Sequence, residues 1–112
     1  MRYREYIDRD GHLNKEWRDE RDCLHRDDGP AIILIFRGGF KSEEFWYSGV
    51  CQNKFGPAII DYNSDGSILR EEYRIGKFHL GNNKDGFWAL WDILNEEERK
   101  HASILKLLAR YS

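Results

Sequence analysis

The feature that most constrains the fold is an internal repeat. The pentapeptide Gly-Pro-Ala-Ile-Ile stands at residues 29–33 and returns at residues 56–60, 27 residues later. A repeat of this length is one supersecondary unit, which buries its apolar face by stacking on its neighbours. Each copy continues with an apolar run, a glycine turn at Gly39 or Gly66, a charged stretch and an aromatic residue. We therefore expect similar units to follow one another along the chain.

One unit has the sequence signature of a β-hairpin. Turn sequences at residues 37–40 and 64–67 lie between runs rich in β-branched and aromatic residues. Residues 60–62 and 73–75 alternate between apolar and polar, as expected for strands with one buried and one wet face. Residues 31–36 are apolar at every position, which predicts a strand covered on both faces.

The C-terminal segment is predicted to supply that cover. Asn95 followed by three glutamates is typical of a helix N-cap with acidic residues in the first turn. Lys106 and Arg110 suit the negative end of a helix dipole, and the residues between form a broad apolar stripe. We expect a helix at residues 96–110, packed over the strand at residues 31–36.

These patterns predict a mainly β fold: a single antiparallel meander sheet of repeated hairpins, with one C-terminal α-helix packed on it. The 112 residues have the length of a single domain. Its expected parts are a partial repeat (1–24), two full repeats (25–53 and 54–83), and a terminal strand that leads into the helix (84–112).

Composition narrows the possible partners. The chain is 34% charged and 14% aromatic, and the aromatic content argues against disorder because large apolar side chains offset chain entropy. A formal net charge of −2 gives no reason to expect nucleic-acid binding. No apolar leader follows Met1, and no run approaches the length of a membrane span. We expect a cytoplasmic protein with no membrane span.

No catalytic or metal-binding spacing is found. The histidines form no HxH, HExxH or Cys/His pattern, and the phosphate-binding and nucleophile motifs are absent. Asp27 and Asp28 precede Gly29, which is ordinary turn chemistry. Cys23 and Cys51 are expected to be free thiols, because the repeat places them about two strands apart and facing opposite ways. The expectation is a protein that is not an enzyme and uses no metal and no cofactor.

Two surfaces are candidates for binding. Trp46 and Tyr73 hold equivalent places in successive units and Trp17 a nearly equivalent one, so the three are predicted to line up on one sheet face. Such a row either packs under the helix or is an exposed binding surface. The mixed charges of residues 15–28 are either a solvated face or a second binding surface. The acidic candidates from that stretch are Asp19, Glu20 and Asp22.

The run His-Arg-Asp-Asp-Gly-Pro-Ala-Ile at residues 25–32, a turn, Trp46-Tyr47 and Gly49 together form a recognisable pattern. It resembles the MORN-variant repeats found in many bacterial and phage proteins. The resemblance covers most of residues 8–91, although residues 52–55 are Gln-Asn-Lys-Phe where the first unit has its charged run. It implies a meandering antiparallel sheet that serves as an interaction module. Some related proteins are labelled antitoxin-like, and others are small phage proteins.

The expected function is therefore that of a non-enzymatic protein-interaction module with a protein partner. The resemblance favours a phage or bacterial regulator that binds and inhibits a host or defence protein. The alternative is an antitoxin-like or small-ligand-binding protein that holds a nucleotide or lipid headgroup on the aromatic face.

Overall fold

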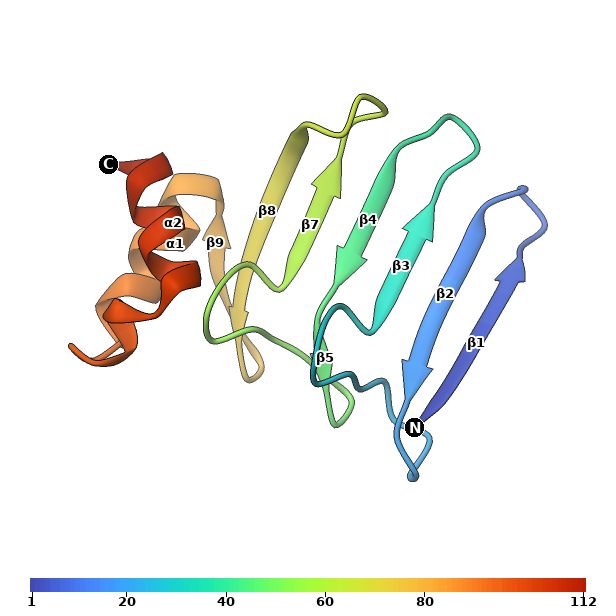
Figure 1. Ribbon diagram of the computed structural model, residues 1–112, viewed down its shortest axis with the longest axis horizontal. Coiled ribbons are helices and arrows are strands. Elements are labelled where there is room, and N and C mark those ends of the chain that lie inside the picture. The colour runs from blue at the N-terminus through green and yellow to red at the C-terminus, as the bar shows by residue number, and fades with distance from the viewer.

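The computed structural model describes all 112 residues and is dominated by one seven-stranded antiparallel sheet (Figure 1). In spatial order its strands are β1 (Arg2–Ile7), β2 (Leu13–Arg18), β3 (Ile32–Ile35), β4 (Lys41–Glu44), β7 (Ile59–Tyr62), β8 (Ile68–Ile75) and β9 (Phe78–Asn82). The short strands β5 (Trp46–Tyr47) and β6 (Val50–Cys51) form a separate pair. The predicted mainly β meander is confirmed.

The hairpin turns repeat along the sheet. In each of three turns, a backbone N–H donates to the carbonyl of the residue four positions later. The pairs are Asp8 and His12, Phe36 and Phe40, and Asn63 and Ser67. Each turn contains a glycine with φ between +82° and +91°, a conformation that costs other residues energy because of their Cβ atom. The residues are Gly11, Gly39 and Gly66. The same type of turn therefore joins three successive pairs of strands.

The repeat is not uniform in its second strand. Ile32 pairs with Glu16 on one side and Glu44 on the other, and Ile59 pairs with Glu44 and Glu72. These three glutamates are therefore equivalent, and they recur every 28 residues rather than every 27. Between Glu44 and Glu72, a register shift where β7 pairs with β8 takes up the extra residue. Because neighbouring strand residues face opposite ways, this single residue decides which side chains share a face.

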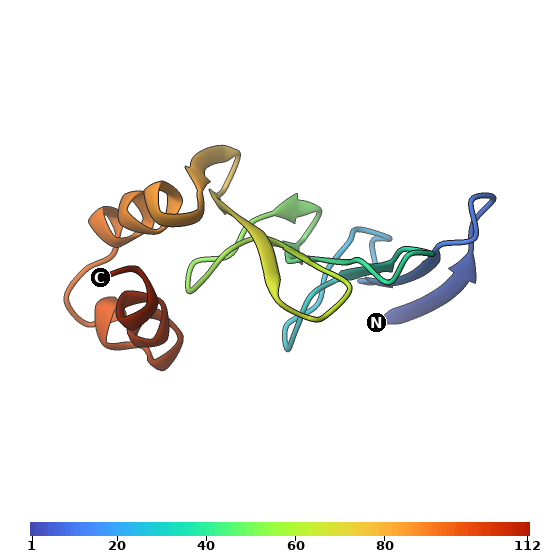
Figure 2. The same ribbon diagram turned by 90° about the horizontal axis from the view of Figure 1, so that it is seen from above.

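The helices gather at one end of the sheet, beside β8 and β9 (Figures 1 and 2). They are α1 (Asn83–Ile93), the short 3-10 helix η1 (Glu98–Lys100) and α2 (Ala102–Tyr111). Between them and β8 lies the main core, which consists of Tyr73, Phe87, Leu90, Leu94, Ile104 and Leu107. None of the helices combines the length and hydropathy of a membrane span.

The C-terminal expectations were wrong in detail. The strand expected after residue 84 is helix α1. Asn95 and Glu98 do bond each other's backbone N–H, at 2.9 and 2.8 Å, but this cap starts only the 3-10 turn. His101 has an extended backbone, with φ −58° and ψ 135°, which interrupts the predicted helix at residues 96–110. The α-helix begins at Ala102, where the His101 side chain accepts a hydrogen bond from the N–H of Ser103.

The apolar strand is not covered by the helix, contrary to expectation. Ile32 to Ile35 are half-buried, and α2 packs against β8 instead of residues 31–36. Long side chains on both neighbouring strands flank Ile32, namely Glu16 and Glu44. The carboxylate of Glu16 forms ion pairs with Arg4 and Arg18, and that of Glu44 accepts a hydrogen bond from Trp46, so both side chains stay against the sheet. The sheet therefore remains a single layer over most of its length.

Candidate functional site

The predicted row of Trp17, Trp46 and Tyr73 does not form. The N–H of Trp17 donates to the carbonyl of Ala31 at 2.9 Å, and the N–H of Phe45 donates to the equivalent Ala58 at 2.7 Å. Phe45, not Trp46, is therefore the counterpart of Trp17. Sequence reasoning missed Phe45 because it assumed a constant repeat length.

Trp46 and Tyr73 do not share a face of the sheet, and each packs in a different environment. The indole Nε1 of Trp46 donates to Glu44 at 2.8 Å, on the sheet face opposite Phe45. Tyr73 is fully buried beneath α1. Its ring and that of Phe87 pack edge to face, with centroids 6.4 Å apart. For Tyr73, the alternative of packing under a helix is the correct one.

Trp17 lies at the far end of the sheet from the helices. Its ring packs against the ring of Tyr3, with centroids 4.7 Å apart. The guanidinium of Arg26 lies over the Trp17 ring, 3.9 Å from the ring centroid. This cation–π contact leaves the tryptophan half-buried by its own neighbours.

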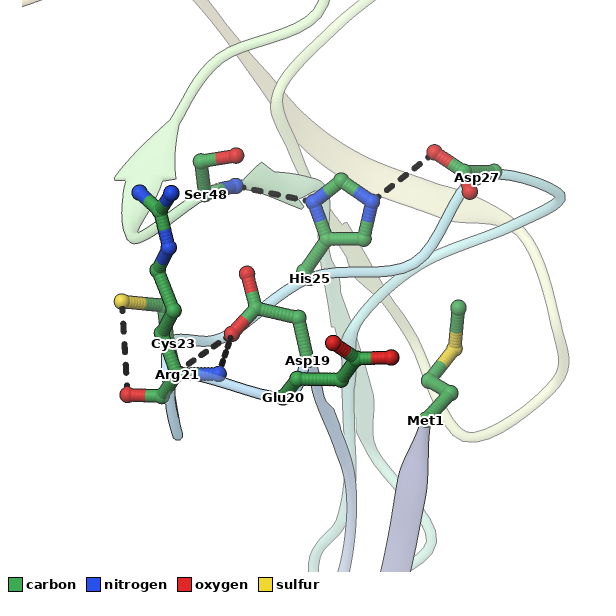
Figure 3. A pocket seen from close by; sticks show the side chains of 8 residues that line it. All are labelled: Met1, Asp19, Glu20, Arg21, Cys23, His25, Asp27 and Ser48. Carbon is green, nitrogen blue, oxygen red and sulfur yellow. Dashed lines mark hydrogen bonds and ion pairs between the residues drawn. The ribbon is translucent and has the colours of Figure 1, made fainter.

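The acidic candidates lie in the loop that follows β2. Asp19 and Glu20 line an open pocket of about 500 Å³, together with His25, Asp27 and others drawn in Figure 3. Asp19 accepts hydrogen bonds from the backbone N–H groups of Cys23 and Arg21 at 3.0 and 2.9 Å. These bonds hold the pKa of Asp19 below its ordinary value. The carboxylate thus closes its own turn.

Asp22 does not join that pocket. Its backbone has φ +65°, and its side chain forms an ion pair with Arg2 at the start of β1. Because both side chains are about two-thirds exposed, at 67% and 64%, this pair contributes little to stability. The structure therefore separates Asp22 from Asp19 and Glu20.

His25 is engaged at both ring nitrogens (Figure 3). Its Nδ1 accepts the N–H of Ser48 at 2.9 Å, so the proton lies on Nε2, which is 2.9 Å from Asp27. One unit later, the side chain of Gln52 accepts the N–H of Gly76 at 2.6 Å. His25 and Gln52 therefore perform the same task, which is to tie a loop to the turn of the next hairpin. We call this contact the inter-unit staple.

The grouping of Asp8, Asp10 and His12 in the first hairpin turn resembles a metal-ligand set, with ligand atoms within 4.8 Å of one another. Asp8 accepts from Asn14 and from the N–H groups of His12 and Asp10, each at 3.0 Å, and these bonds lower its pKa. His12 Nδ1 accepts the N–H of Arg37 at 3.0 Å. The carboxylate of Asp8 and the Nδ1 atom of His12 are thus engaged by hydrogen bonds of the turns, and we assign no metal to this grouping.

A pocket of about 820 Å³ lies between α2 and the sheet. We call it the α2 groove. Its floor is apolar and aromatic and includes Phe45, Tyr47, Ile60, Tyr62 and Ile68. One wall is the basic flank of α2, with Lys106 and Arg110, and the other is the acidic loop with Asp27 and Asp28. A hydrophobic floor thus lies between walls of opposite charge.

A buried carboxylate fixes α2 at the edge of this groove. Glu71 on β8 is 1% exposed and accepts hydrogen bonds from Arg110 at 2.7 Å and from the hydroxyl of Tyr111. Such a buried charge is tolerated because it is paired and hydrogen-bonded. The position of the basic wall is therefore set by the sheet.

The floor stays neutral over the physiological range. The hydroxyl of Tyr62 donates to Glu43 at 2.8 Å. Burial and this carboxylate raise the pKa of Tyr62 far above its ordinary value. The Tyr62 phenol of the floor therefore adds no charge of its own to that of the walls.

No family model, curated protein or solved structure matches this chain. The resemblance to MORN-variant repeats stays a prediction from the sequence.

Proposed function

We propose that this chain is a non-enzymatic protein-interaction module that binds a partner protein in the α2 groove. The observation that carries the proposal is the aromatic floor between walls of opposite charge. Protein interfaces concentrate their binding energy in aromatic side chains that are surrounded by a polar rim. Charges of opposite sign on the two walls would orient the partner and select against wrong ones.

The non-enzymatic part of the proposal is supported by the state of the reactive groups. Both nitrogens of His25 are hydrogen-bonded within the protein. Burial raises the pKa of the Cys51 thiol to about 11, so the thiol is protonated at neutral pH and is a poor nucleophile. These groups serve the fold rather than a reaction.

The finer proposal is that the chain is a phage or bacterial regulator that inhibits a host or defence protein. It rests on the resemblance to MORN-variant repeats. The shape is compatible with it, since the molecule measures 44 × 35 × 22 Å. A broad face of this size can supply the roughly 800 Å² per partner that a standard interface buries.

Affinity capture from a bacterial lysate tests the proposal, with two neighbouring variants compared. Ile68 is 42% exposed and lines the groove, whereas Leu69 is 59% exposed and does not. We expect Ile68→Lys to abolish capture of a stoichiometric protein and Leu69→Lys to retain it. Equal capture by both variants would exclude the groove as the binding site.

The same experiment addresses small-ligand binding. The groove has the volume typical of small-molecule sites, about 300–1,000 Å³, and Lys106 and Arg110 would meet an anionic headgroup. Mass spectrometry of small molecules released from the purified protein separates the two functions. A co-purifying metabolite that Ile68→Lys removes, with no protein captured, would replace the proposal by the alternative.

A further inference from the structure

The second full unit shows how this sheet holds a helical segment. Phe55 stacks on His101 with ring centroids 4.2 Å apart and planes 12° apart, and Lys54 forms an ion pair with Glu98. From β8, Glu71 binds the end of α2. The loop at residues 54–55 thus contacts the start of the segment formed by η1 and α2, and strand β8 contacts its end.

The first full unit has the same framework. Arg26 donates to the carbonyl of Pro30 at 3.2 Å, and Asn53 donates to the carbonyl of Pro57 at 3.1 Å, so the two loops are built alike. The staple of each loop is also equivalent, as described above. Positions 27 and 28 therefore correspond to Lys54 and Phe55.

The equivalent surface of the first unit carries no helix. The side chains of Asp27 and Asp28 are 76% and 86% exposed and bond only to neighbours in their own loop. Phe45 and Tyr47 correspond to Tyr73 and Ile75, which pack in the helical core, but here they line the open groove. The first unit thus presents a helix-holding surface to solvent.

We propose that the first full unit binds an amphipathic helix of the partner protein, which lies in the groove alongside α2. This inference rests on the proposed function and names the structure of the bound segment. The apolar face of the helix packs on Phe45, Tyr47 and Ile60. Lysine or arginine on one flank pairs with Asp27 and Asp28, since the charge at this position is the reverse of Lys54.

Charge also decides between a foreign helix and a second copy of this chain. In its own second unit, the segment presents Glu98 to Lys54. The same segment of a second copy would present Glu98 to Asp27 and Asp28, and like charges at an interface oppose binding. The helix must therefore come from another protein, with a basic flank toward the loop and an acidic flank toward Lys106 and Arg110.

Two synthetic helical peptides test the inference, both longer than about 15 residues so that they form helix readily. Each has a leucine stripe. The first carries lysine on one flank and glutamate on the other, and the second carries glutamate on both. Titration into the full chain is followed by NMR, with helix formation by circular dichroism. The first peptide should bind as a helix, shift the amides of residues 27–29 and 45–47, and bind about tenfold more tightly than the second.

Charge reversal supplies the control. Asp27→Lys with Asp28→Lys should reverse the preference toward the second peptide, whereas the charge-matched Glu96→Lys with Glu97→Lys, at exposed positions outside the groove, should preserve the preference for the first. Equal effects of the two double variants, or shifts confined to other surfaces, would overturn the inference. If neither peptide binds while partner capture still depends on Ile68, the helix is refuted and the proposed function stands. If capture does not depend on Ile68, the proposed function itself fails.

Discussion

The tyrosines around the buried Glu71 carboxylate make the helical core sensitive to alkaline pH. Glu71 is nearly inaccessible to water and accepts hydrogen bonds from Arg110 and from the hydroxyl of Tyr111. Burial, and then the Glu71 carboxylate, raise the pKa of Tyr111 to about 12 and move that of Tyr73 higher still. In the unfolded chain these phenols ionise near their ordinary value of about 10.

Stability is therefore predicted to fall as the pH rises above 10. Between pH 10 and pH 12 the unfolded chain has lost phenolic protons that the native chain still binds, and the free energy of unfolding decreases where the unfolded state binds fewer protons. Denaturant midpoints measured from pH 8 to pH 12 check this, beside tyrosinate absorbance. A midpoint that is constant across this range, with all tyrosines ionising near pH 10, would contradict it.

A single inserted residue explains why the sequence predicts the wrong row of aromatic residues. Trp17 and Phe45 each lie six residues after a turn glycine, and Tyr73 lies seven after its own. Counting from the glycines pairs Phe45 with Trp17, whereas a constant period pairs Trp46 with Tyr73. The position of the bulge depends on strand pairing, which a period alone does not report.

At the scale of the elements, the inter-unit staple explains how successive hairpins keep their register. A histidine makes it in the first full unit and a glutamine in the second, and both accept one backbone N–H. This position requires a side chain that is long enough to accept a hydrogen bond from the backbone N–H of the next turn. The sequence alone shows His25 and Gln52 as a difference between the repeats, because the shared acceptor role depends on where the next turn lies.

Exchanging the staple residues is predicted to be tolerated. His25→Gln and Gln52→His should each change the free energy of unfolding by less than about 0.5 kcal/mol. Gln52→Ala should cost about 1–2 kcal/mol, because the N–H of Gly76 loses its partner. Urea denaturation midpoints give the comparison. A large loss on exchange, with little loss on Gln52→Ala, would show that the hydrogen bond does not hold the hairpins.

The helical cap is the other element on which stability depends. Ile104 is fully buried against β8 and α1, whereas its neighbour Leu105 is 48% exposed. Ile104→Ala is predicted to cost about 2–5 kcal/mol, the usual range for emptying a core position. Leu105→Ala is the matched control and should cost about 0.5 kcal/mol. Similar losses for both variants would mean that α2 is not part of the core.

Over the whole molecule, the meander could be predicted from the sequence and the placement of the helices could not. Two-residue alternation and turn glycines identify hairpins, and successive hairpins form a meander. An apolar helix stripe indicates only that the helix is buried on one side. It does not say which strand lies beneath, and the core instead formed at β8 because Tyr73, Phe87 and Ile104 meet there.

The α2 groove follows from that placement, since the cap covers one end of the sheet and leaves the rest open (Figure 2). The measurement that tests its role most directly is hydrogen–deuterium exchange of the full chain, alone and bound to a captured partner protein. We predict slower exchange on binding at residues 27–30, 45–48 and 101–106, which come from both walls and the floor. Slowing confined to β1 and to the loop at residues 19–23 would contradict the account.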